Sequence, residues 1–307
     1  MRLVFAGTPD AAVPSLRRLA ASDHEIVAVV TRTDAPLGRK RVLTPSPVAQ
    51  AADELGIATI KTDRLDAAAT EAIQALEPDL GVIVAYGGLV REPLLSFPAH
   101  GWINLHFSLL PRWRGAAPVQ RALIAGDAET GVAVFQLVPA LDAGDVFAQR
   151  RVPVPDDATA GTLLADLAIT GADVVADVVD WIAAGTARSI PQTGDPTHAA
   201  KLTLEDGRIR WDESRDAVLS RIRGVTPEPG AHTMLDGARL KVLEARPAPD
   251  GAERLAPGEF ALVERLLLAG TATDPIAVEL VQPAGKGAMR AGDWWRGLRA
   301  ERAVVAS

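Results

Sequence analysis

Apolar segments of strand length alternate with segments of helical periodicity through the first third of the chain, and this alternation limits the folds that the chain can adopt. The segments with the apolar content of buried strands are Arg2–Ala6, Glu25–Thr31, Ala58–Lys61, Leu80–Val84 and Trp102–Phe107. The segments with apolar residues at helical spacing are Ala11–Ala21, Val48–Leu55 and Ala67–Leu76. Parallel strands need a crossover between them, and a helix usually provides it. We therefore predict an α/β first domain around a doubly wound, parallel sheet.

Farther along, the pattern predicts a strand pair and then a long helix. Val132–Leu137 and Val146–Val152 form the pair, and Thr159 caps a helix whose apolar residues recur at helical spacing. The segment after this helix is polar and is interrupted by prolines and glycine, which is typical of a linker between domains. The predicted parts are a first domain, a linker and a second domain, at residues 1–188, 189–206 and 207–307.

Short alternating segments fill the second domain. After a predicted helix at Glu213–Arg223, the segments of strand pattern are Ala231–Leu235, Arg239–Glu244, Gly258–Val263 and Ile276–Gln282. Asp236–Gly237 is the sequence of a tight hairpin turn. Strands at this spacing are typical of a small all-β barrel, and a five-stranded oligonucleotide-binding fold fits the size. We expect Trp294 and Trp295 to pack on the barrel rather than to stack on bases.

Composition bounds the class of protein. The 307 residues are 48% hydrophobic and 23% charged, as in soluble globular proteins. Cysteine is absent, which excludes thiolate metal sites and a cysteine nucleophile and favours a reducing compartment. The apolar run at the N-terminus is too short for a secretory signal, and no run reaches the roughly 18 residues of a membrane span. We expect a cytoplasmic protein that is soluble and monomeric.

Charge is divided unevenly along the chain. Residues 1–206 hold 17 basic and 25 acidic side chains, whereas residues 207–307 hold 15 and 14. The net charge of −7 argues against a general nucleic-acid coat protein, but local basic patches can still bind RNA. The basic residues near the end of the chain are Lys286, Arg290, Arg296, Arg299 and Arg302.

Polar residues interrupt an otherwise apolar strand at Trp102–Phe107. Asn104, His106 and Ser108 recur at the two-residue period that places side chains on one face of a strand. About thirty residues later, a second strand leads into the turn Leu141–Asp145, which carries Asp142. An amide can donate to an oxyanion, an imidazole can move a proton near neutral pH, and a carboxylate can orient the imidazole. Taken alone, each residue more often has a structural role, with Asn104 capping a strand end, His106 satisfied in the core and Asp142 forming a turn, and it is the combination that favours a catalytic site.

Two further features lie near the expected carboxyl ends of the strands. The chain lacks the Gly-x-Gly-x-x-Gly pattern of a dinucleotide site, but Tyr86 ends a strand where open α/β sheets usually bind ligands. Between Arg32 and Pro47 the chain is polar and rich in proline, so we expect an irregular, mobile loop. This loop carries three consecutive basic residues, Arg39, Lys40 and Arg41, within an acidic domain.

The pattern from Asn104 to Gly115, followed by Leu141-Asp142-x-Gly144-Asp145, resembles the signature of the 10-formyltetrahydrofolate-dependent formyltransferases. The sequence Arg112–Arg121 is similar to the branch of that family that formylates methionyl-tRNA. The resemblance covers the chain end to end. It implies a Rossmann-like formyltransferase domain with a parallel sheet, followed by a small oligonucleotide-binding-fold barrel that holds tRNA. It also implies 10-formyltetrahydrofolate as co-substrate and initiator methionyl-tRNA as partner.

Carried over by position, the resemblance gives roles to individual residues. It implies that Asn104, His106 and Asp142 are catalytic. It implies that the folate contacts are Ser108, Leu109, Leu110, Pro111 and Tyr86, and that the tRNA contacts are Arg39, Lys40 and Arg41.

Two other functions stay open from the sequence. A formyltransferase that acts on a sugar-nucleotide amine shares the first domain's motif but has no need of the basic loop. A non-catalytic RNA-binding protein would keep the barrel and the basic end but has no use for the converging Asn104, His106 and Asp142. We expect no metal, because the five histidines form no ligand cluster and cysteine is absent.

Overall fold

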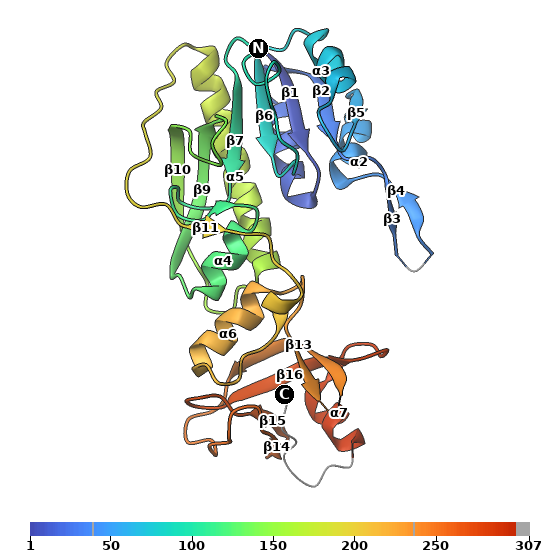
Figure 1. The fold of residues 1–307 in the computed structure, drawn as a ribbon, viewed down its shortest axis with the longest axis vertical. Helices are drawn as coiled ribbons and strands as arrows, with labels where there is room; N and C mark the ends of the chain where they lie inside the picture. Colours follow the sequence, from blue (N-terminus) through green and yellow to red (C-terminus); the bar gives the residue numbers. More distant parts are fainter. Residues whose placement is uncertain (39, 236, 299–307) are drawn as a thin grey trace. The chain divides into compact units, whose positions relative to one another are not determined.

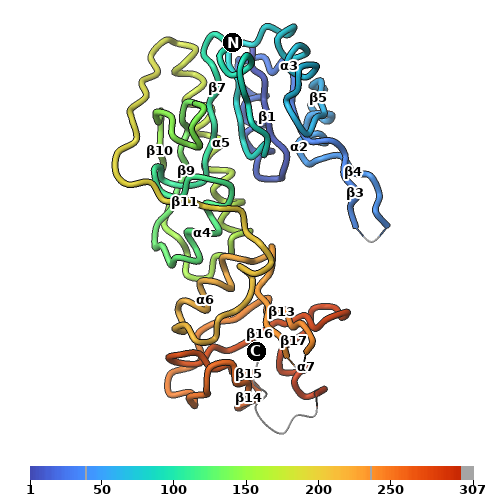
Figure 2. The backbone as a smooth tube through the Cα atoms, in the orientation of Figure 1, coloured from blue at the N-terminus to red at the C-terminus, as the bar shows by residue number. Residues whose placement is uncertain are grey.

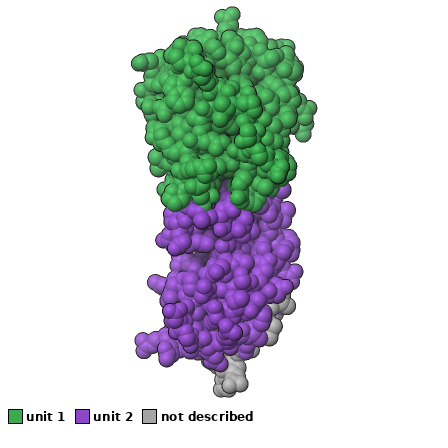
Figure 3. All heavy atoms as spheres, turned by 90° about the vertical axis from the view of Figure 1, so that its left-hand side faces the viewer, with its two compact units in different colours: residues 1–118, 129–153, 164–199 green, residues 119–128, 154–163, 200–307 purple. Residues whose placement is uncertain are grey.

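The computed structural model describes residues 1–38, 40–235 and 237–298. By their contacts, the residues divide into two compact units, coloured separately in Figure 3. Unit 1 comprises Met1–Pro118, Glu129–Pro153 and Leu164–Ala199. Unit 2 comprises Val119–Ala128, Val154–Leu163 and the chain from Ala200 onward.

A sheet of seven described strands forms the centre of unit 1, in the order β10-β9-β7-β6-β1-β2-β5 (Figure 1). Its strands are β1 Arg2–Gly7, β2 Glu25–Thr31, β5 Thr59–Lys61, β6 Leu80–Val84, β7 Trp102–His106, β9 Glu129–Gln136 and β10 Val146–Pro153. From β7 to β5 all neighbours are parallel, which confirms the predicted parallel sheet. Strand β9 pairs antiparallel with β7, and β10 antiparallel with β9.

Helices cover this sheet, as its apolar strands require. They are η1 Asp10–Ala12, α1 Val13–Ala20, α2 Pro47–Glu54, α3 Ala67–Gln74 and the long α5 Ala160–Ala183. The hydroxyl of Ser46 and the carboxylate of Asp66 cap α2 and α3 by accepting from backbone N–H groups. A Cβ on Gly171 of α5 would lie 2.7 Å from Leu105 Cδ2, so this glycine lets α5 approach β7 closely. Strand β7 is therefore held between its two neighbours and a closely packed helix.

The segment between β2 and α2 differs from the irregular loop that we predicted. It contains a two-stranded antiparallel hairpin, β3 Ala35–Leu37 and β4 Val42–Thr44, which extends away from the sheet in Figures 1 and 2. Gly38 and Arg41 have positive φ of 69° and 49° and build the turn. Pro36 is tolerated because a two-stranded ribbon has free edges where no N–H is needed. Lys40 and Arg41 are exposed, and Arg39 lies outside the described residues.

The polar segment after α5 follows unit 1 as far as Ala199 (Figure 2). Ile190 forms a pair of backbone hydrogen bonds with Val146 at the start of β10. The last two residues of this segment form β11 His198–Ala199, which pairs in parallel with β8 Arg114–Gly115. We call residues 189–199 the strap. It ties the turn after β7 to the start of β10.

Unit 2 contains an antiparallel sheet in the order β12-β13-β16-β15-β14, with β17 paired to β16. Its strands are β12 His232–Leu235, β13 Ala238–Pro247, β14 Phe260–Val263, β15 Leu266–Ala269, β16 Ile276–Pro283 and β17 Met289–Arg290. The helices of this part are α4 Pro118–Ile124, η2 Glu205–Gly207, α6 Arg215–Gly224 and α7 Ala291–Gly297. The β-rich second domain is confirmed, although β15, β17 and α7 were not predicted. Asp236 of the predicted hairpin turn lies outside the described residues.

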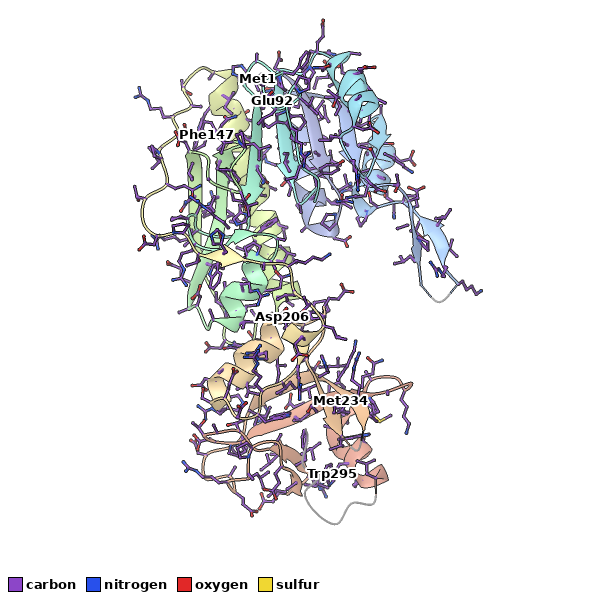
Figure 4. The ribbon with its side chains drawn as sticks, in the orientation of Figure 1. Met1, Glu92, Phe147, Asp206, Met234 and Trp295 are labelled. Atoms are coloured by element: carbon purple, nitrogen blue, oxygen red, sulfur yellow. The ribbon has the colours of Figure 1, made fainter. Side chains whose placement is uncertain are left out.

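Aromatic residues fill the core of unit 2. Trp211 and Phe260 meet edge to face with ring centroids 5.4 Å apart, and the ring of Trp295 stacks with that of Phe260 at 6.3 Å. Trp294 and Trp295 are 7% and 3% exposed, so the prediction that they pack in the domain is confirmed. Figure 4 labels Trp295, which lies in α7. No helix in the described ranges combines the length and apolar character that a membrane span needs.

Candidate active site

Strand β7 and the β9–β10 loop bring His106 and Asp142 together. His106 is the last residue of β7, and the loop after Gln136 folds back so that Asp142 Oδ2 lies 3.8 Å from His106 Nδ1. Both residues are buried, with exposed fractions of 6% and 8%. Burial removes the water that would otherwise screen the carboxylate, so its charge acts strongly on the imidazole.

The other ring nitrogen of His106 fixes the tautomer. Nε2 lies 2.8 Å from the carbonyl oxygen of Trp113, and a carbonyl can only accept, so Nε2 carries the proton and donates it. In the neutral imidazole the free lone pair is then on Nδ1, which faces Asp142. Nδ1 is thus the atom that can take a proton, and Asp142 is placed to stabilise the resulting imidazolium.

The pKa of His106 favours this role. Burial lowers the pKa of the imidazole below its ordinary value, while the charge of Asp142 and the hydrogen bond to Trp113 O act in the opposite direction. The net direction is downward, so His106 is neutral and able to act as a base at neutral pH.

Backbone groups of the turn after β7 hold both side chains. Trp113 supplies the carbonyl for His106, and Gly115 N donates to Asp142 Oδ2 over 2.7 Å. Trp113 and Asp142 have positive φ of 60° and 46°, a conformation that non-glycine residues adopt at a cost. Such conformations persist where the surrounding structure holds them, often at functional sites.

Asn104 lies on the same face of β7 as His106, two residues earlier. Its side chain is half-buried and forms no hydrogen bond with another described residue. An amide on a central strand, with no hydrogen-bond partner among the described residues, has the N–H donors that an oxyanion would need.

Ser108–Pro111 follows β7 and Tyr86 follows the neighbouring strand β6, and both segments are closely packed. Ser108 is fully buried, and its hydroxyl donates to Arg112 O over 2.6 Å. Tyr86 is 1% exposed, and its hydroxyl donates to Thr62 O. Burial raises the pKa of this phenol, with Arg32 opposing the effect in part. The side chains of Ser108 and Tyr86 shape the loops, so a bound ligand would meet mainly their backbone, together with the half-buried Leu109 and Pro111.

One residue of the site escaped the sequence analysis. Gln192, in the strap, donates from Nε2 to the carbonyls of Asp142 and Gly144, each over 2.8 Å. Its Oε1 accepts from Arg114 Nε and Nη2 over 3.1 and 2.6 Å. A glutamine in a polar, proline-containing segment carries no pattern that distinguishes it from solvent-exposed residues.

A metal is not suggested by the ligands present. Among the described residues no group of three or more histidine, aspartate or glutamate side chains is arranged to hold an ion.

Sequence comparisons identify the family. The profile described as "Formyl transferase" matches residues 1–179, and "Formyl transferase, C-terminal domain" matches residues 201–299. A methionyl-tRNA formyltransferase of Clavibacter sepedonicus is 60% identical over 99% of this chain and 100% of its own. The chain belongs to the methionyl-tRNA formyltransferase family.

Solved structures of formyltransferases share the fold. The methionyl-tRNA formyltransferase from Clostridium thermocellum matches with a TM-score of 0.60 at 15% identity, over 94% of this chain and 100% of its own. An N-formyltransferase from Helicobacter canadensis, solved with folinic acid and dTDP-3-aminofucose, matches with a TM-score of 0.70 at 17% identity, over 92% and 98%. The methionyl-tRNA formyltransferase family thus shares its fold with enzymes that act on sugars, and fold alone does not choose the acceptor.

Proposed function

We propose that this protein transfers the formyl group of 10-formyltetrahydrofolate to the α-amino group of initiator methionyl-tRNA. The observation that carries the proposal is the 60% identity to a methionyl-tRNA formyltransferase along the whole of both chains. The juxtaposition of Asp142 with His106, which lies on the same strand as Asn104, supports it chemically. The reaction belongs to the cytoplasm, where tRNA is charged and used.

In the proposed mechanism the amine of methionyl-tRNA attacks the formyl carbon and a tetrahedral oxyanion forms. The amide of Asn104 donates to this oxyanion, which is the charge that develops in the transition state. His106 Nδ1 accepts the proton from the attacking amine, and Asp142 stabilises the imidazolium. The bond from carbon to N10 of the folate then breaks, and the imidazolium returns the proton to N10. Formylmethionyl-tRNA and tetrahydrofolate are the products.

We assign folate binding to the segment Ser108–Pro111 and to the backbone at Tyr86. These residues directly follow β7 and β6, the two parallel strands that meet next to His106. Ligands in open α/β sheets bind at the carboxyl ends of such strands. The fixed backbone that Ser108 and Tyr86 maintain supplies hydrogen-bonding groups without the cost of ordering a loop on binding.

We assign recognition of the tRNA acceptor end to the β3–β4 hairpin. Its tip carries Lys40 and Arg41 in the described part and Arg39 in the sequence, and its strands expose Leu37, Val42 and Leu43 by 60–67%. Basic groups beside exposed apolar side chains suit a nucleic acid, which offers phosphates and the flat faces of unpaired bases.

The experiment that tests this function offers the purified protein 10-formyltetrahydrofolate with two acceptors in parallel, initiator methionyl-tRNA and a dTDP-linked amino sugar. We expect formylmethionyl-tRNA and no formylated sugar. Formylation of the sugar with no product on the tRNA would instead establish the alternative acceptor.

A further inference from the structure

Gln192 lies outside the proposed catalytic set, and its side chain contacts the backbone of Asp142 directly. Its amide spans two segments that are far apart in the sequence, the β9–β10 loop and the turn after β7. On one side Nε2 donates to the carbonyls of Asp142 and Gly144. On the other side Oε1 receives two hydrogen bonds from the Arg114 guanidinium. The Nε2 group therefore makes two hydrogen bonds as a donor, and Oε1 makes two as an acceptor.

The backbone conformation of Asp142 needs contacts of this kind to be maintained. Its φ of 46° is unfavourable for a residue with a Cβ, so the loop would relax without contacts that keep it in place. Gly115 N fixes the carboxylate, and Gln192 fixes the carbonyl of the same residue. The side chain and the backbone of Asp142 are therefore anchored separately.

The rest of the strap gives Gln192 a rigid base. Ile190 pairs with Val146 on one side, over 2.8 and 3.0 Å. On the other side, Thr197 O accepts from Arg114 N over 2.8 Å and Thr197 Oγ1 accepts from Trp113 N over 2.9 Å. A side chain on a segment fixed at both ends can place a neighbouring group to within a fraction of an ångström.

We propose that Gln192 is a positioning residue for formyl transfer: its amide sets the backbone of Asp142 so that the carboxylate faces Nδ1 of His106. This inference rests on the function proposed above and adds a residue of the strap to the machinery. Gln192 does not touch the reacting atoms, and it acts through Asp142.

Two variants distinguish the contribution of the Nε2 donor from that of the Oε1 acceptor. Gln192→Ala removes both contacts. Gln192→Glu has the same shape and keeps an acceptor for Arg114, but it has no N–H to donate to the two carbonyls. Because a displacement of about 1 Å at a reacting group can cost about 100-fold, we expect both variants to lower kcat by about 10- to 100-fold. The KM values for folate and for methionyl-tRNA should change by less than about twofold, since a residue that acts only through the position of Asp142 affects the chemical step and not substrate binding.

A matched control is Gln136→Ala. Gln136 is also a half-buried glutamine of unit 1 whose Nε2 donates to two backbone carbonyls, those of His100 and Trp102. It should stay within about twofold of the wild-type kcat. Thermal melting of all variants shows whether loss of rate follows loss of folding, and if Gln192→Ala melts far below the control, the isosteric Gln192→Glu carries the test.

A double-mutant cycle with Asp142→Asn shows whether Gln192 acts through Asp142. We expect Gln192→Ala to cost 10- to 100-fold in the wild-type background and less than about threefold in the Asp142→Asn background, measured in single turnovers with excess enzyme. A Gln192→Glu variant at wild-type kcat, or equal losses in both backgrounds, would overturn the inference while leaving the proposed function intact. Wild-type turnover by Asp142→Asn itself would remove the role of Asp142, and this inference with it.

Discussion

His106 and Asp142 are each held by a backbone group from the turn that follows Pro111, Trp113 O for the imidazole and Gly115 N for the carboxylate. These contacts decide which nitrogen of His106 faces Asp142 and can accept a proton. Trp113 and Asp142 both have positive φ, so the backbone at these two positions is strained. The chemistry of the site therefore depends on the shape of a turn as well as on the side chains that define it.

The first prediction at this scale concerns Asp142→Asn. The negative charge of Asp142 raises the pKa of His106 against the lowering by burial, so its removal should lower that pKa further. The acid limb of kcat/KM reports the pKa of the base in the free enzyme, so this limb should move to lower pH while the plateau falls. A pH profile with a limb that is unchanged or moved to higher pH would show that His106 is not the titrating base.

A second prediction concerns Gly115, where φ is 126° and a Cβ would lie 2.6 Å from Ala199 O. Gly115→Ala should destabilise unit 1 by about 1–3 kcal/mol and reduce activity, because the N–H that fixes Asp142 would move with the strand. The matched control is Gly185→Ala, where φ is 68° and no atom lies within 4 Å of the added Cβ. Urea unfolding of both variants measures the difference, and equal losses would show that contact with the strap contributes nothing.

Part of the site could be predicted from the sequence alone. Asn104 and His106 interrupt an apolar strand at a period of two, and this pattern is visible without any structure. The same pattern could not show that Trp113 O and Gly115 N complete the site, since backbone groups leave no signature in the sequence. Gln192 was missed because its partners, Asp142 and Arg114, lie 50 and 78 positions away. The roles of the predicted site residues stay predictions until they are tested by substitution.

At the scale of elements, the hairpin β3–β4 shows where local pattern fails. Its prolines and Gly38 argued for an irregular loop, but a ribbon of two short strands needs few N–H groups and uses glycine in its turn. The parallel strands were predicted correctly because β1, β2 and β6 are nearly continuous apolar runs between segments of helical pattern. The predicted pairing of β9 with β10 is confirmed, but the antiparallel attachment of β9 to β7 depends on tertiary pairing, which strand pattern does not encode.

The hairpin prediction is that Lys40→Ala with Arg41→Ala raises the KM for methionyl-tRNA about tenfold and leaves kcat at saturating tRNA nearly unchanged. Both side chains are exposed, so we expect their loss to remove the proposed phosphate contacts without lowering the stability of the fold. The KM for folate should stay constant. Arg91→Ala, another exposed basic residue of unit 1, serves as control. An unchanged KM for tRNA in the double variant would remove the hairpin from recognition.

At the scale of the whole molecule, charge separates the two ends of the chain. The first 206 residues are acidic and the remainder is close to neutral, with Lys286, Arg290 and Arg296 near the described end. Arg299 and Arg302, which the sequence analysis grouped with them, lie outside the described residues. We propose that catalysis takes place in unit 1 and that unit 2 contributes further contacts to the tRNA. The domain boundaries at 188 and 207 and the monomeric state stay predictions.

The corresponding prediction is a steep salt dependence of tRNA affinity. Each phosphate that a basic side chain neutralises releases counterions, so the logarithm of the affinity should fall linearly with the logarithm of salt concentration. Lys286→Ala with Arg290→Ala should flatten that slope by about 1–2, whereas folate binding should keep its weak salt dependence. Filter binding of methionyl-tRNA across a salt series measures the slope, and the same slope in wild type and variant would exclude these residues from the interface.

In the proposed mechanism, Asn104 stabilises the oxyanion formed when methionyl-tRNA takes the formyl group of 10-formyltetrahydrofolate. The most direct test is the single-turnover rate at which isotopically labelled formyl passes from folate to methionyl-tRNA, compared between the wild-type protein and a folded Asn104→Ala variant. We expect transfer by the wild type and a rate at least about 10²–10³-fold lower in the variant, as for loss of one oxyanion donor. Transfer by Asn104→Ala at the wild-type rate would contradict the account.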